Sequence, residues 1–209
     1  MTTVEDEVQT IERRSIQRIL AMLWQKYYIV VIFFAMVVVS SFIDSKFLSF
    51  ANISNVLKQQ AVPGIVALGE LMVILTAGID LSVGSLVALT GVLAVGLQRD
   101  MPLVPAVLLA LLVGLGGGLI SGLLISKRNI PPFIATLGMM AIARGLTYIY
   151  THGGPIQITY KPYEFLGRGM IGPVPFIVIM WVIITAIMWV VLRRTTFGRT
   201  TLAIGSNPV

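Results

Sequence analysis

The sequence lacks cysteine and contains few charged residues. Without cysteine the chain has no disulfides, thiolate nucleophiles or zinc–thiolate sites. Charged residues make up 11% of the 209 residues, whereas soluble domains usually contain about 25%. The chain is 56% hydrophobic and has long uncharged runs. These features are typical of membrane proteins, so the net charge of +6 does not indicate nucleic-acid binding.

The sequence also lacks the motifs of common catalytic classes. It has no GxxxxGKS or GxxxxGKT loop with which to hold nucleotide phosphates. Its one histidine, His152, has no second histidine or cysteine nearby, so we interpret it as a loop residue rather than a metal ligand. No Ser-His-acid set is placed to act within a membrane. We therefore expect a chain that is not an enzyme and binds no cofactor or metal itself.

Six apolar stretches are long enough, or nearly so, to cross a bilayer as helices. A helix rises about 1.5 Å per residue, and about 30 Å of hydrocarbon must be crossed. We therefore predict an all-α, polytopic membrane bundle, with a cytoplasmic tail at 1–26, a transmembrane domain at 27–192 and a cytoplasmic segment at 193–209. The spans are predicted at 27–43, 61–77, 82–98, 102–126, 132–150 and 173–192.

Basic residues predict that the N-terminus is cytoplasmic. With six spans, basic residues on the N-terminal side of the membrane outnumber those opposite, as the positive-inside rule requires. The pairs Lys127-Arg128 and Arg193-Arg194 directly adjoin span ends. No small-residue cleavage site follows the first apolar run, so we expect no cleavable signal peptide.

The segment before the first span has two readings. Ile16, Ile19, Leu20, Leu23 and Trp24 share one helical face, as in a helix that lies on the inner membrane surface. A cytoplasmic continuation of the first span fits equally well.

Glycines concentrate in the second, third and fourth spans. In the fourth span, Gly114, Gly118 and Gly122 form overlapping GxxxG spacings. Small residues allow close backbone contact where lipid provides no hydrophobic drive for association. We interpret them as tight packing within one bundle rather than as a dimer seam.

Asp80 follows Gly78 and precedes Ser82 between two apolar stretches. Asp80 or Ser82 can accept hydrogen bonds from the N–H groups that open the next helix, so we predict a capped turn near the cytoplasmic surface. A cation- or proton-binding carboxylate, or a role in gating or in the substrate path, are the alternatives.

Glu70 and Arg144 each lie near the middle of a predicted span. Ionisable groups inside a membrane usually face the bundle interior and find partners. Their opposite charges and similar depth suggest an ion pair between them. The alternative is that each pairs with backbone, water or other parts of the molecule.

The predicted external loop, residues 151–172, is long and rich in glycine and proline. It carries Tyr160, Tyr163 and Phe165. Such loops are often docking surfaces, although a solvated connector is an equally good interpretation.

Several stretches resemble one known family. FGRTTLAIGSNPV is similar to the cytoplasmic coupling segment of bacterial ribose-type ABC-importer permeases. LMVILTAGIDLSVGSLVALTGVLAV and NIPPFIATLGMMAIARGLTYIYTHGGPI also resemble spans two, three and five of that family. The likeness begins near Tyr27. Because the basic segment after the sixth span stops at a Gly205 and Asn207-Pro208 turn signal, we expect a truncated chain.

The resemblance implies an inner-membrane subunit of a monosaccharide importer, for a sugar such as ribose, xylose or galactose. Its expected partners are a second permease subunit, a cytoplasmic ABC ATPase that holds ATP and magnesium, and a periplasmic sugar-binding protein. The residues that the resemblance assigns to the ATPase contact are Phe197, Gly198, Arg199, Ala203, Gly205, Asn207 and Pro208.

Two other classes remain open at this point. A proton- or sodium-coupled carrier could bind its ion at Asp80 and Glu70 and would transport without an ATPase. A membrane scaffold would bind partners but move no solute.

Overall fold

The structure is a computed structural model and describes residues 4–206. The chain forms two compact units, residues 1–53 and 54–209, which are considered separately. Its elements are helices apart from one pair of two-residue strands, so the all-α membrane class predicted from the sequence is confirmed.

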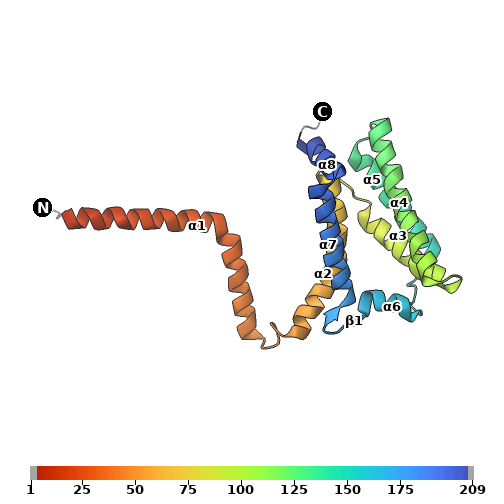
Figure 1. Cartoon of the computed structure of the whole chain (residues 1–209), viewed down its shortest axis with the longest axis horizontal. Coiled ribbons are helices and arrows are strands. Elements are labelled where there is room, and N and C mark those ends of the chain that lie inside the picture. Colours follow the sequence, from red (N-terminus) through yellow and green to blue (C-terminus); the bar gives the residue numbers. More distant parts are fainter. Residues whose placement is uncertain (1–3, 207–209) are drawn as a thin grey trace. The chain divides into compact units, whose positions relative to one another are not determined.

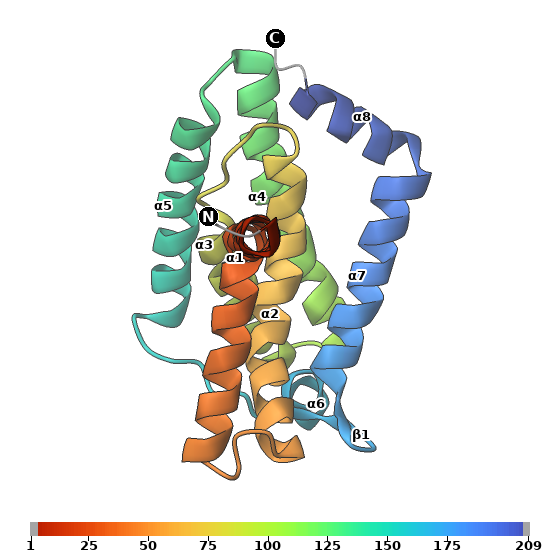
Figure 2. The same cartoon turned by 90° about the vertical axis from the view of Figure 1, so that its left-hand side faces the viewer.

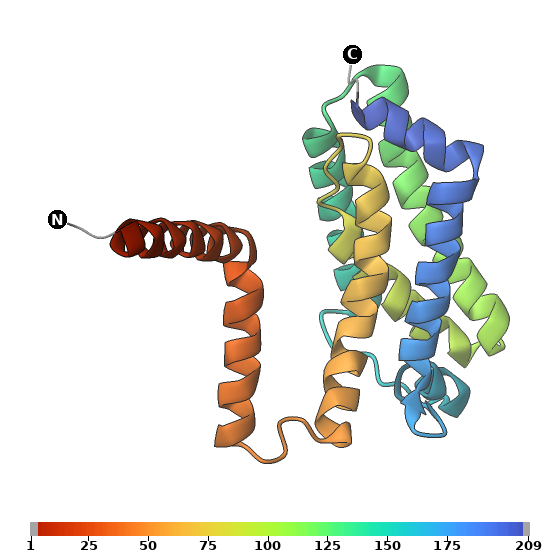
Figure 3. The ribbon, with the colours of Figure 1, turned by 60° about the vertical axis from the view of Figure 1, so that its left-hand side comes forward.

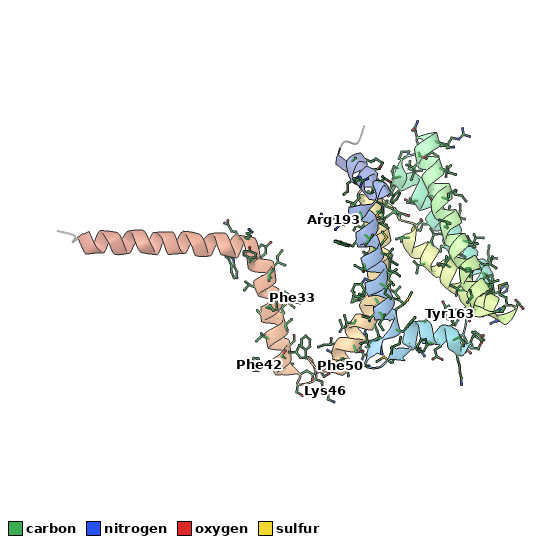
Figure 4. The ribbon with its side chains drawn as sticks, in the orientation of Figure 1. Phe33, Phe42, Lys46, Phe50, Tyr163 and Arg193 are labelled. Carbon is green, nitrogen blue, oxygen red and sulfur yellow. The ribbon has the colours of Figure 1, made fainter. Side chains whose placement is uncertain are left out.

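The first unit is dominated by one helix, α1 (Val4–Ile43). Its residues Trp24–Ile43 are apolar enough to cross a membrane. Figure 3 shows that α1 bends, and Phe33 and Phe42 project from the arm beyond the bend (Figure 4). One bent helix runs through the tail and the first span, and both readings of the segment before that span stay open. The side chains of the predicted interfacial face before Trp24 lie outside the described residues, so membrane-surface binding stays a prediction.

The second unit contains the remaining helices (Figures 1 and 2). Their bounds, with α2 beginning in the first unit, are α2 (Phe50–Ile74), α3 (Val83–Gly96), the 3-10 turn η1 (Leu97–Arg99), α4 (Leu103–Arg128), α5 (Pro132–Thr151), α6 (Lys161–Arg168), α7 (Phe176–Arg194) and α8 (Thr196–Ser206). Strands β1 (Met170–Ile171) and β2 (Val174–Pro175) pair antiparallel between α6 and α7.

The third predicted span, 82–98, coincides with a shorter apolar helix, Val83–Arg99, made of α3 and η1. In the part of the chain that the structure describes, five helices are long and apolar enough to cross a membrane, namely α1, α2, α4, α5 and α7. Helix α3 has 14 residues and rises about 21 Å, which is less than the roughly 30 Å of hydrocarbon. The α2–α3 loop, residues 75–82, precedes α3 and is not helical.

The helices of the second unit place two sets of elements at opposite ends. Helix α8 lies with the last turns of α4 and α7 at one end, which we call the α8 end, and α6 lies with β1 at the other, the α6 end (Figures 1 and 2). Figure 4 places Arg193 at the α8 end and Tyr163 on α6. Helix α3 packs against both α4 and α5.

Small side chains form the interior of the second unit. The buried residues are mostly alanine, serine, threonine and glycine, including Ala61, Ala94, Ala106, Ala110, Ala135 and Ala143. A Cβ on Gly117 would approach Leu86 of α3 at 2.7 Å, and one on Gly114 would approach Thr90 at 3.0 Å. Tight packing within the bundle is therefore confirmed for these two glycines. Gly118 and Gly122 have open space beside them, so neither predicted GxxxG pair packs as a pair among the described residues.

Helices α2 and α7 meet at another glycine. A Cβ on Gly64 would overlap the indole ring of Trp181. We expect Gly64→Leu to force α2 and α7 apart and to lower the free energy of unfolding by about 1–3 kcal/mol. Thermal unfolding in detergent, followed by tryptophan fluorescence, measures this. Gly69→Leu on the same helix is the matched control, since a Cβ at Gly69 meets nothing within 4 Å. Equal melting temperatures for the two variants would contradict the predicted contact.

Candidate functional site: the α2–α3 loop and helix α8

The α2–α3 loop begins where α2 closes with a left-handed residue. Ala77 has φ 57°, and the N–H of Gly78 donates to the carbonyl of Val73 at 3.0 Å. This pattern ends many helices, but the left-handed position is usually glycine because a Cβ is disfavoured there. Ala77 therefore takes a conformation disfavoured for a residue with a Cβ at the point where the chain leaves α2.

Asp80 organises the end of the loop that leads into α3. Its Oδ1 accepts hydrogen bonds from the backbone N–H of Ser82 at 2.7 Å and from the Ser82 hydroxyl at 2.6 Å. Ser82 precedes the first residue of α3 but makes no side-chain cap bond to it. Asp80 therefore forms the turn that the sequence predicted, whereas the Ser82 hydroxyl serves as a donor to Asp80 and not as the helix cap.

The turn is buried within the second unit. Figure 2 shows the loop leaving the α8 end and running into the unit to reach α3. Its position relative to the membrane surface stays a prediction. Ser82 is 0% exposed. Backbone that is not helical at membrane depth must have its polar groups satisfied by the protein. The carboxylate of Asp80 meets that need for Ser82.

Glu70 has a different partner from the one predicted. Its Oε1 accepts a hydrogen bond from the backbone N–H of Asp80 at 3.4 Å. No ion pair joins Glu70 to Arg144 within residues 4–206, and Arg144 is exposed on α5. The Glu70–Arg144 prediction is therefore wrong. The sequence showed two opposite charges at similar depth, but it did not show that the backbone N–H of Asp80, ten residues after Glu70, would bond to the Glu70 carboxylate.

Thr136 of α5 was missed by the sequence reasoning. It is 2% exposed, and its hydroxyl lies 3.3 Å from the carbonyl of Ile79 and 2.8 Å from that of Pro132. A threonine inside a helix commonly bonds to the carbonyl four residues earlier, so nothing in its sequence position pointed to the loop. Glu70 and Thr136 thus bring polar side chains of α2 and α5 to the loop, and the shorter contact of the Thr136 hydroxyl is with Pro132 of its own helix.

Helix α8 was expected to be an unresolved segment with a turn at Gly205, and this is also wrong. Residues Thr196–Ser206 form a helix that includes Gly205. The hydroxyl of Thr195 donates to the Val191 carbonyl at 2.6 Å and accepts from the Gly198 N–H at 3.2 Å, so one side chain joins α7 to α8. Asn207 and Pro208 lie outside the described residues.

One face of α8 is packed against the second unit. Gly198 and Thr201 are buried, and a Cβ on Gly198 would overlap backbone atoms of Val191 and Leu192. A Cβ on Gly205 would overlap the carbonyl oxygen of Leu75. Small residues at i, i+3 and i+7 lie on one helical face, and this spacing was a signal that sequence reasoning could have used. Within the family-derived set, Gly198 and Gly205 therefore face inward.

The other face of α8 is exposed. Phe197, Arg199 and Ala203 are exposed side chains, and Arg199 and Ala203 lie four residues apart on the same face. The α8 end also carries basic residues, namely Lys127 and Arg128 in the last turn of α4 and Arg193 and Arg194 in the last turn of α7. The described residues that the family resemblance assigns to the ATPase contact thus form two groups. Gly198 and Gly205 pack α8 against the second unit, and Phe197, Arg199 and Ala203 are exposed.

The predicted external loop contains a helix, α6, and a cavity beside it. Phe165 of α6 packs on Phe176 of α7 with ring centroids 5.3 Å apart. The cavity measures about 820 Å³ and is bounded by α3, α4 and α6 among other elements. Its walls are mostly apolar, with polar side chains from Thr90, Gln157, Tyr163, Glu164 and Arg168. Burial raises the pKa of the Tyr163 phenol above its ordinary value, so the hydroxyl remains a donor.

Comparisons with known proteins show that the chain is similar to permease components of transport systems. Residues 52–209 match the family described as the permease component of branched-chain amino acid transport systems. The chain is 44% identical to the ribose import permease protein RbsC of Bacillus subtilis over 177 residues, which are 83% of this chain and 55% of that protein. It is 33% identical to the galactose/methyl galactoside import permease protein MglC of Escherichia coli, over 87% of this chain and 59% of that protein.

A third relative is the D-allose transport system permease protein AlsC of Escherichia coli, 34% identical over 90% of this chain and 58% of that protein. The chain thus spans little more than half the length of these relatives. No solved structure matched the chain.

Proposed function

The chain belongs to the ABC permease family that includes the ribose import permeases, and from this membership we propose that it is a membrane subunit of an ATP-driven monosaccharide importer. In this proposal the N-terminus and α8 lie in the cytoplasm of a bacterium, and the α6 end faces the periplasm. A separate ABC ATPase holds ATP and magnesium, a periplasmic binding protein delivers the sugar, and a second permease subunit, a copy of this chain, completes the pathway.

The observation that carries this proposal is the two-sided character of α8. Its small residues fit against the ends of α2 and α7, while Phe197, Arg199 and Ala203 remain exposed at an end rich in basic residues. Basic residues favour the cytoplasmic side of a membrane protein. A helix that is docked on one face and exposed on the other supports contact with a cytoplasmic partner.

The polar contacts in the α2–α3 loop support the importer over the ion-coupled carrier. Glu70 and Asp80 are the carboxylates that such a carrier would use, but both accept hydrogen bonds from the loop. A neutral sugar requires no charged site in the membrane. Import against a gradient must then take its energy from a partner that binds two conformations of the bundle with different free energies.

The cavity at the α6 end supports the proposal that the sugar binds to the bundle there. Its volume of about 820 Å³ falls within the range of small-molecule sites, roughly 300–1,000 Å³. Tyr163 and Gln157 contribute hydrogen-bonding groups to its mainly apolar walls. We place the first contact of the sugar with this chain there, after release from the binding protein. In this proposal the binding protein, rather than this chain, determines which sugar is imported.

Ala203→Trp tests the proposed ATPase contact. A large side chain at the exposed face of α8 obstructs a docked partner, and we expect co-purified ATPase and ATP-dependent sugar uptake to fall by about tenfold or more. Uptake in membrane vesicles and the ATPase recovered with the tagged chain are measured.

Ser45→Trp is the matched control for the added bulk, since Ser45 is exposed in the turn between α1 and α2 and does not line the cavity. Normal ATPase recovery with Ala203→Trp, or uptake driven by an ion gradient without ATPase, would exclude the proposed coupling.

A further inference from the structure

The α2–α3 loop lies between α8 and the interior of the second unit. Gly205 of α8 approaches the Leu75 carbonyl so closely that a Cβ would overlap it. Leu75 is the first residue of the loop, directly after α2. No side chain separates the two backbones here, so any displacement of α8 toward the unit acts on the beginning of the loop.

The far part of the loop is tied to two other helices. The N–H of Asp80 donates to Glu70 of α2 at 3.4 Å, and the hydroxyl of Thr136 on α5 lies 3.3 Å from the Ile79 carbonyl. Asp80 then binds Ser82 through two hydrogen bonds, and α3 begins at the next residue. The loop therefore contacts α8 at its start and both α2 and α5 near its end.

Helix α3 is the element best placed to respond. It is shorter than a full span, and it packs against α4 and α5 with small buried residues such as Ser85 and Ala94 at its surface. Its connection to α2 is not helical, so α3 can shift relative to α2 through changes in the loop dihedrals and in the loop's contacts with Glu70 and Thr136. Hinges in transporters are commonly such loop or helix-end positions.

We propose that the α2–α3 loop is the link through which α8 moves α3, with Gly205, Glu70 and Thr136 as positioning residues. The inference rests on the proposed function, in which α8 carries the motion of the ATPase. Gly205 brings α8 into direct backbone contact with the loop. Contacts with Glu70 and Thr136 position the loop, so that a displacement of Leu75 also displaces Asp80 and Ser82.

The first experiment needs no ATPase. Hydrogen exchange of residues 75–82 is measured by mass spectrometry on the purified chain, as wild type, Gly205→Val and Gly69→Val. We expect Gly205→Val to raise exchange in this segment by about tenfold, since loss of the α8 contact makes local opening easier. Gly69→Val, beside which there is open space, should leave it unchanged. Equal exchange in wild type and Gly205→Val would overturn the inference.

The second experiment uses the chain with its ATPase. Thr136 lies on α5, away from the exposed face of α8, so Thr136→Val should leave ATP hydrolysis intact while sugar uptake falls by about tenfold. Thr136→Ser retains the hydroxyl and should restore uptake. Normal uptake by Thr136→Val, or no rescue by Thr136→Ser, would contradict the loop's role. Failure of the ATPase to bind wild-type chain would instead reject the proposed function and leave the exchange result standing.

Discussion

Asp80→Leu is expected to abolish transport and to destabilise the chain, whereas Asp80→Asn should be mild. Leucine removes the acceptor for both the Ser82 N–H and the Ser82 hydroxyl, and Ser82 is fully buried. Each buried donor left without a partner costs about 1–3 kcal/mol, so we expect a loss of about 2–4 kcal/mol in the free energy of unfolding. Asparagine retains a side-chain oxygen that can accept both bonds.

The measurements for Asp80 are membrane levels, thermal unfolding in detergent and sugar uptake. Asp100→Leu is a useful control for loss of a carboxylate, because Asp100 is exposed between η1 and α4 and does not line the cavity. It should leave membrane levels, thermal stability and uptake unchanged. Complete and equal loss of uptake in Asp80→Asn and Asp80→Leu, at normal membrane levels, would instead favour the ion-coupled carrier.

Gly198→Leu is expected to detach α8 from the end of α7. A Cβ at this position overlaps backbone atoms of Val191 and Leu192, which cannot move aside as a side chain could. Overpacking of this kind costs about 3 kcal/mol, and the chain can avoid it by displacing α8. We expect faster cleavage by trypsin at Arg199 and loss of ATP-dependent uptake.

Thr200→Leu provides the matched control for Gly198→Leu, because Thr200 lies on the same helix and is exposed. It should change neither the cleavage rate at Arg199 nor the thermal stability. If Gly198→Leu and Thr200→Leu were cleaved at the wild-type rate and both supported uptake, the docking of α8 through its small face would be refuted.

The spans that could be predicted most closely are those with a long, uniform apolar run. Predicted spans 102–126 and 173–192 correspond to α4 (Leu103–Arg128) and α7 (Phe176–Arg194). The third predicted span, 82–98, coincides with α3 and η1, Val83–Arg99, a helix shorter than the other spans. Hydropathy did not show how the non-helical residues 75–82 before it are held. A non-helical segment in a membrane is possible only when specific acceptors exist elsewhere in the chain, and these are not visible in local composition.

The candidate site likewise contains some residues whose role could be predicted from the sequence and others whose role could not. The capping role of Asp80 could be predicted because its hydrogen bonds reach only two residues along the chain. The roles of Glu70 and Thr136 could not, since their partners lie ten and 57 residues away. The docked face of α8 was within reach, because Gly198, Thr201 and Gly205 follow a helical period, but the family resemblance led us to treat the whole segment as one contact surface.

The small residues in the interior of the second unit leave the long aliphatic side chains on the outside. Leu112, Leu115 and Leu119 of α4 are each more than half exposed, and of the most hydropathic stretch of α4 only 17% is buried. The strongest contacts of these side chains are therefore with acyl chains or neighbouring subunits. Extraction into short-chain detergent should loosen the helices well before any polar contact breaks, and long-chain detergents or lipid nanodiscs are the appropriate media for biochemical work.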